Sequence, residues 1–310
     1  MKVLSCNISI GSYTFDFVHS VEVDSSWDLL TDTAIIKMPS KLKLDKDQLK
    51  NVLKRGDKVI VKLGYNDALK TVFKGYLTRI KPTTPIELYC EDEMWKLKQI
   101  DINTSFKGGS LNDFLTDLFP DVKINAFDLQ MAPFHASSIN GAELLDKIKS
   151  EYSLYSFFRN DELVIGKQYD PNNYNKHIFI IDYNMESDDL EFLTKDELII
   201  AVKAISNNAD GTKTEIELGD KGGDTTTLNF YNLKKTELQK VAEKEIERLK
   251  YDGWRGGFTA FGEPFIKHGD VIELRHEKDS DKTGAYWVDE VVYTYGVNGY
   301  RQDIKLGART

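Results

Sequence analysis

The sequence has few cysteines and no long apolar run. Only two of the 310 residues are cysteine, Cys6 and Cys90, and each lies in an alternating apolar stretch. A buried, reduced thiol is the ordinary interpretation of a cysteine in that setting. No stretch approaches the roughly 18 consecutive apolar residues that a membrane-spanning helix needs. The sequence therefore predicts neither a disulfide framework nor a membrane span.

The N-terminus lacks the features of a secretory signal. "MKVLSCNISIGSYTFDF" has one lysine followed by alternating polar and apolar residues, a pattern typical of strands. A signal peptide would instead contain a continuous apolar segment. We expect the chain to be made and used, or assembled, in a cytoplasm.

The sequence also lacks an excess of positive charge. The formal net charge is −9. This charge argues against a protein that binds nucleic acid tightly, because such binding needs lysine and arginine side chains in contact with the phosphates. It leaves open that nucleic acid passes close by without binding. With 41% hydrophobic and 29% charged residues, the chain has the composition of a soluble globular protein.

Signatures of catalysis and metal binding are missing. None of the histidines falls in a His-Glu-x-x-His or similar ligand spacing, and the chain has no Gly-x-Ser-x-Gly elbow or phosphate-binding loop with a lysine. No catalytic residue, cofactor or metal ligand is predicted, and we expect a protein that is not an enzyme. The five histidines are His19, His135, His177, His268 and His276.

Three stretches are weaker candidates for a site. "DKGGDTTT" (220–227) has residues that bind phosphate or metal, but it lacks a strand–loop–helix context, so a surface loop is favoured. "ESDDLE" (186–191) lacks the alternating oxygen ligands of a calcium loop, so a solvated acidic loop is favoured. "WRGGFTAFGEP" (254–264) interleaves aromatics with glycine, which favours a bent strand with buried rings over base or sugar stacking.

The first predicted unit is a small β-barrel over residues 1–102. Its residues alternate with period two, a turn at Gly11-Ser12 separates two strands, and "DTAIIKMP" predicts a strand that stops at Pro39. Several short strands without a long helix between them are typical of a barrel or sandwich. "LKLDKDQLKNVLKRGD" (42–57) predicts a loop, with a short helix as the alternative.

The second predicted unit is a small α+β module over residues 103–172. Ser110 precedes an amphipathic helix that ends at Pro120, and Asn140 precedes another, with Glu143 at the capping-box position. "SFFRNDELVIG" then predicts a hairpin that turns at "RND".

The third predicted unit is a second β-barrel over residues 173–310 with one inserted helix at about 236–250. Thr236 is expected to cap this helix, and Gln239 occupies the capping-box position. "LIIAVKAISNNADGTKTEIELGD" predicts a hairpin, and the chain ends in further strands. The fold class is therefore mainly β, with two similar small barrels and a two-helix α+β module.

The two barrels begin from a repeated turn. "KRGDKVIVKLGY" contains Gly56 and Asp57, and "KHGDVIELRH" contains Gly269 and Asp270. The apolar phase after both turns is the same, and a tyrosine enters the next strand in "KGYLTRI" and in "GAYWVDEVV". A Gly-Asp turn before a strand is common by itself, so the order of the following strands carries the interpretation. We treat these four residues as structural repeat turns.

The order of these features resembles the baseplate hub proteins of contractile phage tails, of the late-control protein D type, and the hub part of type VI secretion spike proteins. The resembling segments include "LTDTAIIKMP", "LKRGDKVIVKLGY" and "CEDEMWKLK" in the first part, and "GFTAFGEPFIKHGDVIEL" and "GYRQDIKLG" in the last. No needle-like extension follows Gly307, so the resemblance implies a spike on a separate chain.

The resemblance implies a homotrimer whose six barrels form a ring around a channel. Such a ring joins a sixfold tail tube to a threefold spike, contacts other baseplate proteins, and lets DNA pass without specific binding. It would belong to a virion tail baseplate or injection-system particle assembled in the bacterial host cytoplasm. Two alternatives stay open: a cell-wall-degrading or carbohydrate-binding component of a tail or secretion system, and a general β-barrel adaptor.

Overall fold

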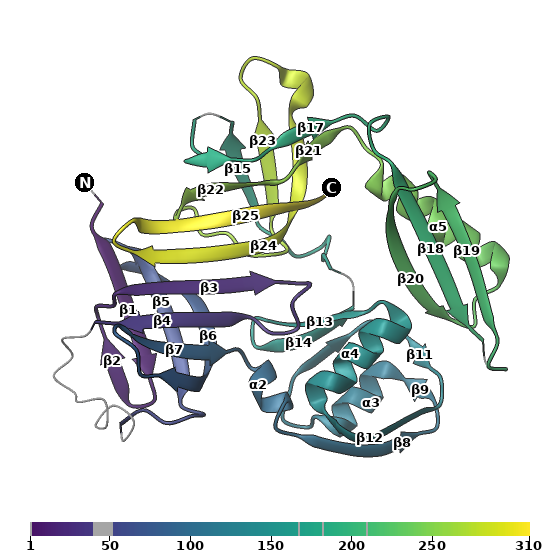
Figure 1. Ribbon diagram of the computed structural model, residues 1–310, viewed down its shortest axis with the longest axis horizontal. Helices are drawn as coiled ribbons and strands as arrows, with labels where there is room; N and C mark the ends of the chain where they lie inside the picture. Colours follow the sequence, from purple (N-terminus) through teal and green to yellow (C-terminus); the bar gives the residue numbers. More distant parts are fainter. Residues whose placement is uncertain (1, 40–51, 167, 182, 209) are drawn as a thin grey trace.

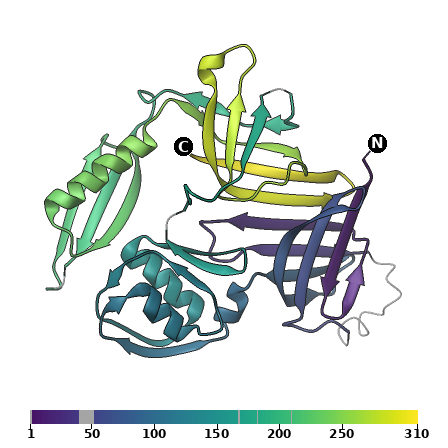
Figure 2. The ribbon, with the colours of Figure 1, turned by 180° about the vertical axis from the view of Figure 1, so that it is seen from behind.

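The computed structural model of the protein describes residues 2–39, 52–166, 168–181, 183–208 and 210–310 (Figure 1). Most of this chain is β-strand, and the helices lie to one side of the central strands (Figures 1 and 2). The predicted fold class, mainly β with a small helical module, is confirmed. None of the helices in the described ranges is long and apolar enough to cross a membrane.

One continuous sheet joins the two ends of the chain. Its strand order is β16-β22-β25-β24-β3-β4-β7-β6-β5-β1-β2, and β23 pairs with both β24 and β15. The strands from the first part are β1 (Leu4–Ile10), β2 (Tyr13–Phe15), β3 (Ser20–Ser26), β4 (Thr33–Met38), β5 (Lys58–Tyr65), β6 (Ala68–Lys81) and β7 (Ile86–Glu91). Those from the last part are β15 (Lys176–Ile180), β16 (Ser187–Asp188), β22 (Gly257–Phe261), β23 (Val271–Arg275), β24 (Gly284–Gly296) and β25 (Gly299–Arg309).

Alternation along these strands decides which face is buried. In β3, Val21 and Val23 are buried whereas Glu22 between them is exposed, because neighbouring side chains point to opposite faces of a sheet. The inward faces of both halves meet in one apolar cluster, which includes Ile8 and Ile304. The two halves of the chain therefore share a core.

The middle module has its own core and hydrogen-bonded sheets. Both predicted caps are confirmed: Ser110 accepts a hydrogen bond from the Asp113 amide, and Asn140 and Glu143 form a reciprocal capping box. The hairpin turning at "RND" is confirmed too, because Arg159 pairs with Glu162 across it. The elements are α2 (Met94–Leu97), β8 (Asp101–Phe106), β9 (Gly109–Ser110), α3 (Leu111–Leu118), β10 (Ile124–Ala126), β11 (Gln130–Met131), β12 (Phe134–Asn140), α4 (Gly141–Tyr152), β13 (Tyr155–Arg159) and β14 (Glu162–Gly166).

A third body projects from the last part of the chain (Figure 1). It consists of β18 (Ile200–Asn207), β19 (Lys213–Gly219) and β20 (Asp224–Tyr231), with α5 (Lys235–Leu249) packed on them. Its apolar core, which contains Val202 and Leu238, is separate from that of the shared sheet. The helix expected within the second barrel therefore packs on a sheet of its own. The remaining strands, β17 (Glu191–Leu193) and β21 (Gly253–Arg255), pair with each other beside the shared sheet.

Two local expectations about this third body are wrong. The helix begins at Lys235 rather than after Thr236, because the Glu237 carboxylate accepts a hydrogen bond from the Lys234 amide at 2.8 Å and completes the first turn. "DKGGDTTTLNFYN" is not simply a surface loop: its threonines belong to β20, which pairs in parallel with β18. β-branched residues suit strands, and the glycines before them form the turn. Most of the possible helix at 42–57 lies outside the described residues.

Candidate functional site

The two repeated turns have the same hydrogen bonds. In the first, the Gly56 amide donates to the Leu77 carbonyl at 2.7 Å, and the Leu77 amide donates to the Asp57 carbonyl at 2.9 Å. In the second, the same two bonds join Gly269 and Asp270 to Val288, at 2.8 and 2.9 Å.

The aspartate of each turn holds the loop in front of it. Asp57 Oδ2 accepts from the Lys54 amide at 2.7 Å, and Asp270 Oδ2 accepts from the Lys267 amide at 3.0 Å. This side-chain-to-backbone bond three residues back is a typical role of aspartate in turns. The equivalence thus extends from the backbone to the side chains.

The strands after the turns pair in the same register. Lys58 lies opposite Tyr76 in the first part, and Val271 lies opposite Trp287 in the last part, at the same distance from the turn. The sequence comparison of the two tyrosines is wrong by one position, because Gly75 rather than Tyr76 is equivalent to Tyr286. A slip of one residue reverses which face a side chain occupies.

Both units also have an irregularity in strand pairing, just after the residue that is hydrogen-bonded to the turn. The pairing of β6 with β7 shifts between Leu77 and Arg79, and that of β24 with β25 shifts between Val288 and Glu290. These positions are equivalent when counted from the two turns. One difference remains at the far side: β1 pairs antiparallel with β5, whereas β15 pairs parallel with β23.

The two halves meet where β3 pairs antiparallel with β24, from Ser26 opposite Glu290 to Ser20 opposite Gly296. Beside this junction, the Trp27 indole N–H donates to Asp289 Oδ1 at 2.8 Å, and the Tyr169 hydroxyl donates to the same oxygen. Burial raises the pKa of Asp289, although both of these hydrogen bonds oppose the shift.

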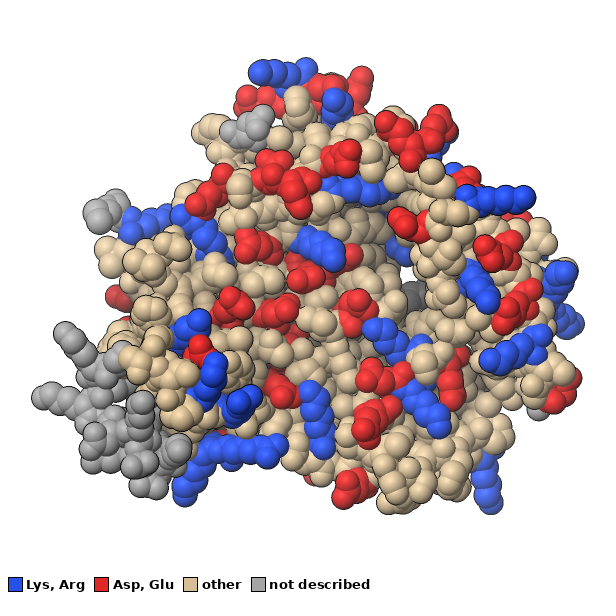
Figure 3. Space-filling view, in the orientation of Figure 1, with Lys and Arg blue, Asp and Glu red and all other residues tan. Residues whose placement is uncertain are grey.

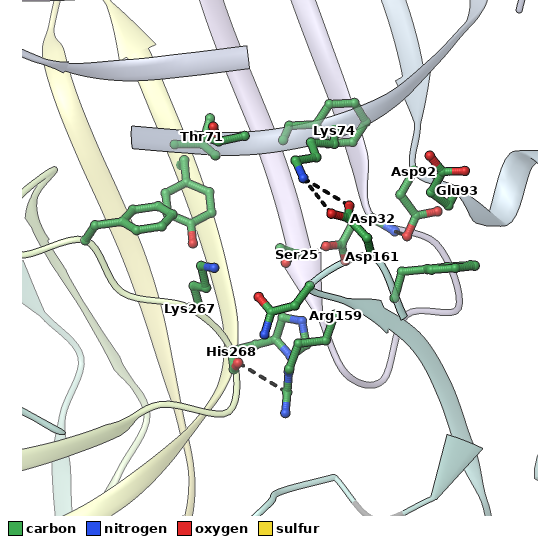
Figure 4. Close-up of a pocket in the computed structure, with 16 residues that line it drawn as sticks. Ser25, Asp32, Thr71, Lys74, Asp92, Glu93, Arg159, Asp161, Lys267 and His268 are labelled. Carbon is green, nitrogen blue, oxygen red and sulfur yellow. Dashed lines mark hydrogen bonds and ion pairs between the residues drawn. The ribbon is translucent and has the colours of Figure 1, made fainter. Parts of the chain in front are cut away.

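A cavity of about 340 Å³ lies at this junction (Figure 4). Its walls come from the first part of the chain, from the tip of the β13–β14 hairpin, and from the loop before the second turn. Residues that sequence analysis did not single out therefore gather here. Those labelled in Figure 4 are Ser25, Asp32, Thr71, Lys74, Asp92, Glu93, Arg159, Asp161, Lys267 and His268.

The buried Asp92 and the half-buried Asp32 form a pair of carboxyl groups. Asp32 accepts hydrogen bonds from the Ser25 hydroxyl at 2.6 Å and the Ser26 amide at 3.2 Å, while its own amide donates to Asp92 Oδ2 at 3.2 Å. No lysine or arginine among the described residues forms an ion pair with either group. Burial raises the pKa of both carboxyls; the charge of Asp32 raises that of Asp92 further, and the charge of Asp24 raises that of Asp32.

Arg159 anchors the hairpin against the second turn. Its Nη2 donates to His268 Nδ1 at 3.1 Å and lies 3.3 Å from the His268 carbonyl oxygen. Burial, and next the charge of Arg159, lower the pKa of His268 to about 3, so this imidazole is neutral at pH 7. Near the hairpin tip, Lys74 forms an exposed ion pair with Asp161 at 2.8 Å.

The glycine of each turn lies against a different part of the chain. Gly56 has φ +92° and Gly269 has φ +81°, a region that side chains rarely adopt. A Cβ on Gly56 would lie 3.1 Å from Trp95, and one on Gly269 would overlap Nη2 of Arg159. Sequence reasoning missed both contacts because neither Trp95 nor Arg159 is near its glycine in the chain.

The outward face of the shared sheet is acidic near its centre. Figure 3 shows acidic side chains gathered over the region of β3, β24 and β25. Glu22 and Asp24 point outward from β3, and burial, then Glu290 and Glu22, raise the pKa of Asp24. One row across the strands reads Thr259, Asp303, Val292, Asp24, Thr33 and Glu91.

The weaker sequence candidates do not come together into a site. Residues 220–227 belong to the third body, and 254–264 form β21, β22 and the loop after them. Residues 186–191 lie along β16, at one end of the shared sheet, and reach the start of β17 in the small sheet beside it. Among the described residues, no group of three or more His, Cys, Asp or Glu side chains is arranged to hold a metal ion.

Comparisons with known proteins identify the fold. No protein-family model matches the sequence, and no curated protein matches it. Among solved structures, a tail protein from Neisseria meningitidis MC58 is similar over 99% of this chain and 97% of that chain, with 13% identity and a TM-score of 0.68.

Two further solved structures agree. A 43 kDa tail protein of prophage MuSo2 from Shewanella oneidensis is similar over 98% of this chain and 97% of its own, with 13% identity and a TM-score of 0.64. An E. coli component of the type VI secretion system, described as structurally similar to the T4 tail proteins gp27 and gp5, covers 98% of this chain and 77% of its own, with 10% identity and a TM-score of 0.64. The chain thus has the fold of phage tail and type VI secretion proteins.

Proposed function

We propose that this chain is the structural baseplate hub of a contractile tail or injection system. Three copies form a ring of six similar units, which joins the sixfold tail tube to the threefold spike and encloses a channel. The ring acts by assembly and symmetry matching, and release of the spike opens the channel. The chain makes and breaks no covalent bonds in this role.

The observation that carries the proposal is the internal repeat within one sheet. Two units with the same turn, the same strand register and the same irregularity follow each other side by side in a single chain. A trimer of such chains presents six nearly equivalent surfaces, which is what a sixfold partner requires. The fold shared with tail proteins supports the same assignment.

The parts of the chain would have different tasks. The units within 1–102 and 173–310 form the ring, and the module at 103–172 contacts neighbouring baseplate proteins. The outward face of the shared sheet, with Glu22, Asp24 and Asp303, lines the channel. An acidic wall neutralises no phosphates, so DNA passes without being held. The particle is assembled in the host cytoplasm.

Native mass spectrometry of the purified chain over a range of concentrations tests this proposal. The expected result is a trimer that becomes the main species as concentration rises, because heterologous contacts close only when the ring is complete. A chain that stays monomeric at high concentration, or forms only dimers, would overturn it.

A further inference from the structure

We infer that two strand edges of this chain, Glu191–Leu193 and Arg79–Lys81, pair with each other between neighbouring copies. The inference rests on the proposed ring and specifies the contact that closes it. It assigns a common partner, a second copy of the chain, to an edge of β17, which pairs with β21 beside the shared sheet, and to the end of β6 that extends beyond its pairing with β5. The pairing is antiparallel and has a defined register.

The template for this contact is the junction inside each chain. There, β3 of the first unit pairs with β24 of the second, with Asp24 opposite Val292. In the order across the sheet, β3 is the strand of the first unit that lies next to the second unit, and β24 continues past the irregularity at Val288 before it reaches β3. A repeat of two equivalent units leaves one such edge unused at each end.

The first unused edge belongs to the second unit. β16 and β17 lie along β22 and β21 in one unbroken register, with Ser187 opposite Thr259 and Glu191 opposite Arg255. β3 lies along β4 in the same way, with Ser20 opposite Lys37. In the described ranges, β16 and β17 have no strand on their other side, which is the side that β24 covers in β3.

The second unused edge belongs to the first unit. β6 pairs with β5 only as far as Tyr76, and beyond Leu77 it pairs with β7 alone. Arg79–Lys81 is equivalent to Glu290–Val292 of β24, because both segments follow the same irregularity. On the side where Glu290–Val292 meets β3, Arg79–Lys81 has no strand partner within the part of the chain that the structure describes.

The register of the internal β3–β24 junction predicts which residues of the two edges lie opposite each other. Asp24 corresponds to Glu191 and Val292 corresponds to Lys81, so the internal pair Asp24–Val292 predicts that Glu191 lies opposite Lys81 of the next copy. By the same step, Leu193 lies opposite Arg79. Unpaired edges are sites at which chains associate, and pairing them leaves none exposed in a closed ring.

The charges of the two edges favour pairing of the first edge with the second edge of another copy over pairing of two identical edges. The first edge is acidic, with Asp188, Asp189 and Glu191 all exposed. The second is basic, with Arg79 exposed on the strand and Arg55 exposed beside it. Opposite charges directly across two strands stabilise their pairing, whereas like charges oppose it. Two acidic edges or two basic edges would therefore not pair symmetrically.

The hollow beside the basic edge has a counterpart at the internal junction. It is lined by Leu53, Lys54 and Arg55 from the loop before the first turn and by Thr78–Ile80 of β6. In the internal junction, the equivalent residues Lys267 and His268 line the cavity that the first unit closes. The hollow is therefore placed where the acidic edge of the next copy would complete it.

Disulfide trapping tests the register. Directly opposed residues of antiparallel strands have Cα atoms about 4.5–5.5 Å apart, which is within the range that a disulfide requires. In the variant Lys81→Cys/Glu191→Cys, the two cysteines would form such a pair between neighbouring copies. β6 and β17 lie on opposite sides of the intervening strands β24, β3 and β4 (Figures 1 and 2), so a disulfide between the two positions must join different chains. Cys6 and Cys90 are buried and stay out of surface cross-links. Mild oxidation should give covalent dimers and trimers on a non-reducing gel.

The matched control is Lys81→Cys/Glu186→Cys. Glu186 is exposed on the same acidic segment but lies five residues away from Glu191, about 16 Å along a strand. We expect at least tenfold less cross-linked product from this variant. Native mass spectra of both reduced variants report whether the trimer itself forms.

The outcomes separate this inference from the proposed function. The pairing is supported if both reduced variants form a trimer but only Lys81→Cys/Glu191→Cys forms cross-links on oxidation. A trimer with no cross-link at 81/191, or with equal cross-linking in the control, overturns the pairing and leaves the ring standing. A chain that stays monomeric without any substitution overturns both.

Charge reversal provides an independent test that needs no new cysteine. Glu191→Lys and Lys81→Glu should each weaken trimer formation by about threefold, the size typical of an exposed ion pair, and the double reversal should restore it. Glu247→Lys, on the exposed face of α5, is the control and should leave the trimer unchanged. Equal weakening in the double reversal and the singles would contradict the pairing.

Discussion

At the scale of single residues, the junction contains two acids where ordinary packing would place apolar groups. Asp92 is buried and Asp32 is half-buried, and neither has a lysine or arginine ion pair in the described ranges. Their hydrogen-bond donors include Ser25, Ser26 and the Met94 amide. An ionised carboxyl in such a place is costly, so the folded state favours the protonated form.

This arrangement predicts how stability depends on pH. Burial raises the pKa of Asp32 to about 7, from an ordinary value near 4 in the unfolded chain. The folded state therefore binds more protons than the unfolded state between these values. The contribution of Asp32 is fully present below about pH 4 and is lost as pH rises through about 7, by at most about 1.4 kcal/mol per pH unit.

Asp32→Asn should remove that dependence, because the amide cannot ionise. Urea unfolding of the wild type and the variant at pH 5, 6, 7 and 8 checks this: the free energy of unfolding should fall less with rising pH in the variant. Asp161→Asn, which removes an exposed carboxylate at the edge of the same cavity, should follow the wild-type curve. Parallel curves for wild type and Asp32→Asn would contradict the account.

At the scale of elements, each repeated turn lies against a side chain that is distant from it in the sequence. The β13–β14 hairpin reaches the second turn through Arg159, and Trp95, just after β7, lies against the first turn at Gly56. The exposed Lys74–Asp161 pair near the hairpin tip adds little, because ion pairs in water contribute about 0–1 kcal/mol. The half-buried Arg159 is therefore the main polar anchor of the hairpin.

Gly269→Ala should destabilise the protein more than an equivalent change elsewhere. A Cβ at this left-handed position costs about 1–2 kcal/mol by itself. At Gly269 the added Cβ also displaces Arg159 from His268, so the free energy of unfolding should fall by roughly 3 kcal/mol in total. Urea denaturation measures the difference in unfolding free energy.

The matched control is Gly222→Ala, at φ +76° with no atom within 4 Å of the added Cβ, which should lose only the backbone cost. In an Arg159→Ala background, the cost of Gly269→Ala should fall to that of the control. An equal cost of Gly269→Ala with and without Arg159 would show that the clash has no part in it.

Local patterns predicted the elements better than their partners. Ser110 and Asn140 were found as helix caps because a cap is recognised within four residues of sequence. The start of α5 was missed because Thr236 is a good cap by composition, whereas Glu237 completes the turn from Lys234. The glycine-rich start of residues 220–232 favours a loop, whereas the threonines that follow it form β20.

The junction between the units could not be predicted from the sequence. β3 and β24 each have the alternation of an ordinary strand, and nothing within either indicates that they pair across more than 260 residues. Asp32, Asp92 and Arg159 were missed for the same reason, because the cavity that unites them exists only after the halves and the hairpin have come together. The repeated turns were visible because their residues lie side by side in the chain.

At the scale of the whole molecule, the chain is a pair of equivalent units in one sheet with two further bodies attached. The middle module lies against both units through Lys74 and His268. The third body, with β18–β20 and α5, projects from the second unit and also contacts the middle module, where the Asn229 amide donates to Ser153 Oγ at 2.7 Å. A ring of such chains would repeat one kind of junction, alternately within and between copies. The attached bodies would then lie on every second unit and give the ring a threefold outline.

Cryo-electron microscopy of the purified chain at high concentration tests this central claim most directly. The account predicts a closed ring of three copies in which the turns at Gly56 and Gly269 alternate at one radius, with an unbroken sheet passing from each copy to the next. Separate monomers, or a ring in which the two turns lie at different radii and no strand edges meet between copies, would contradict it.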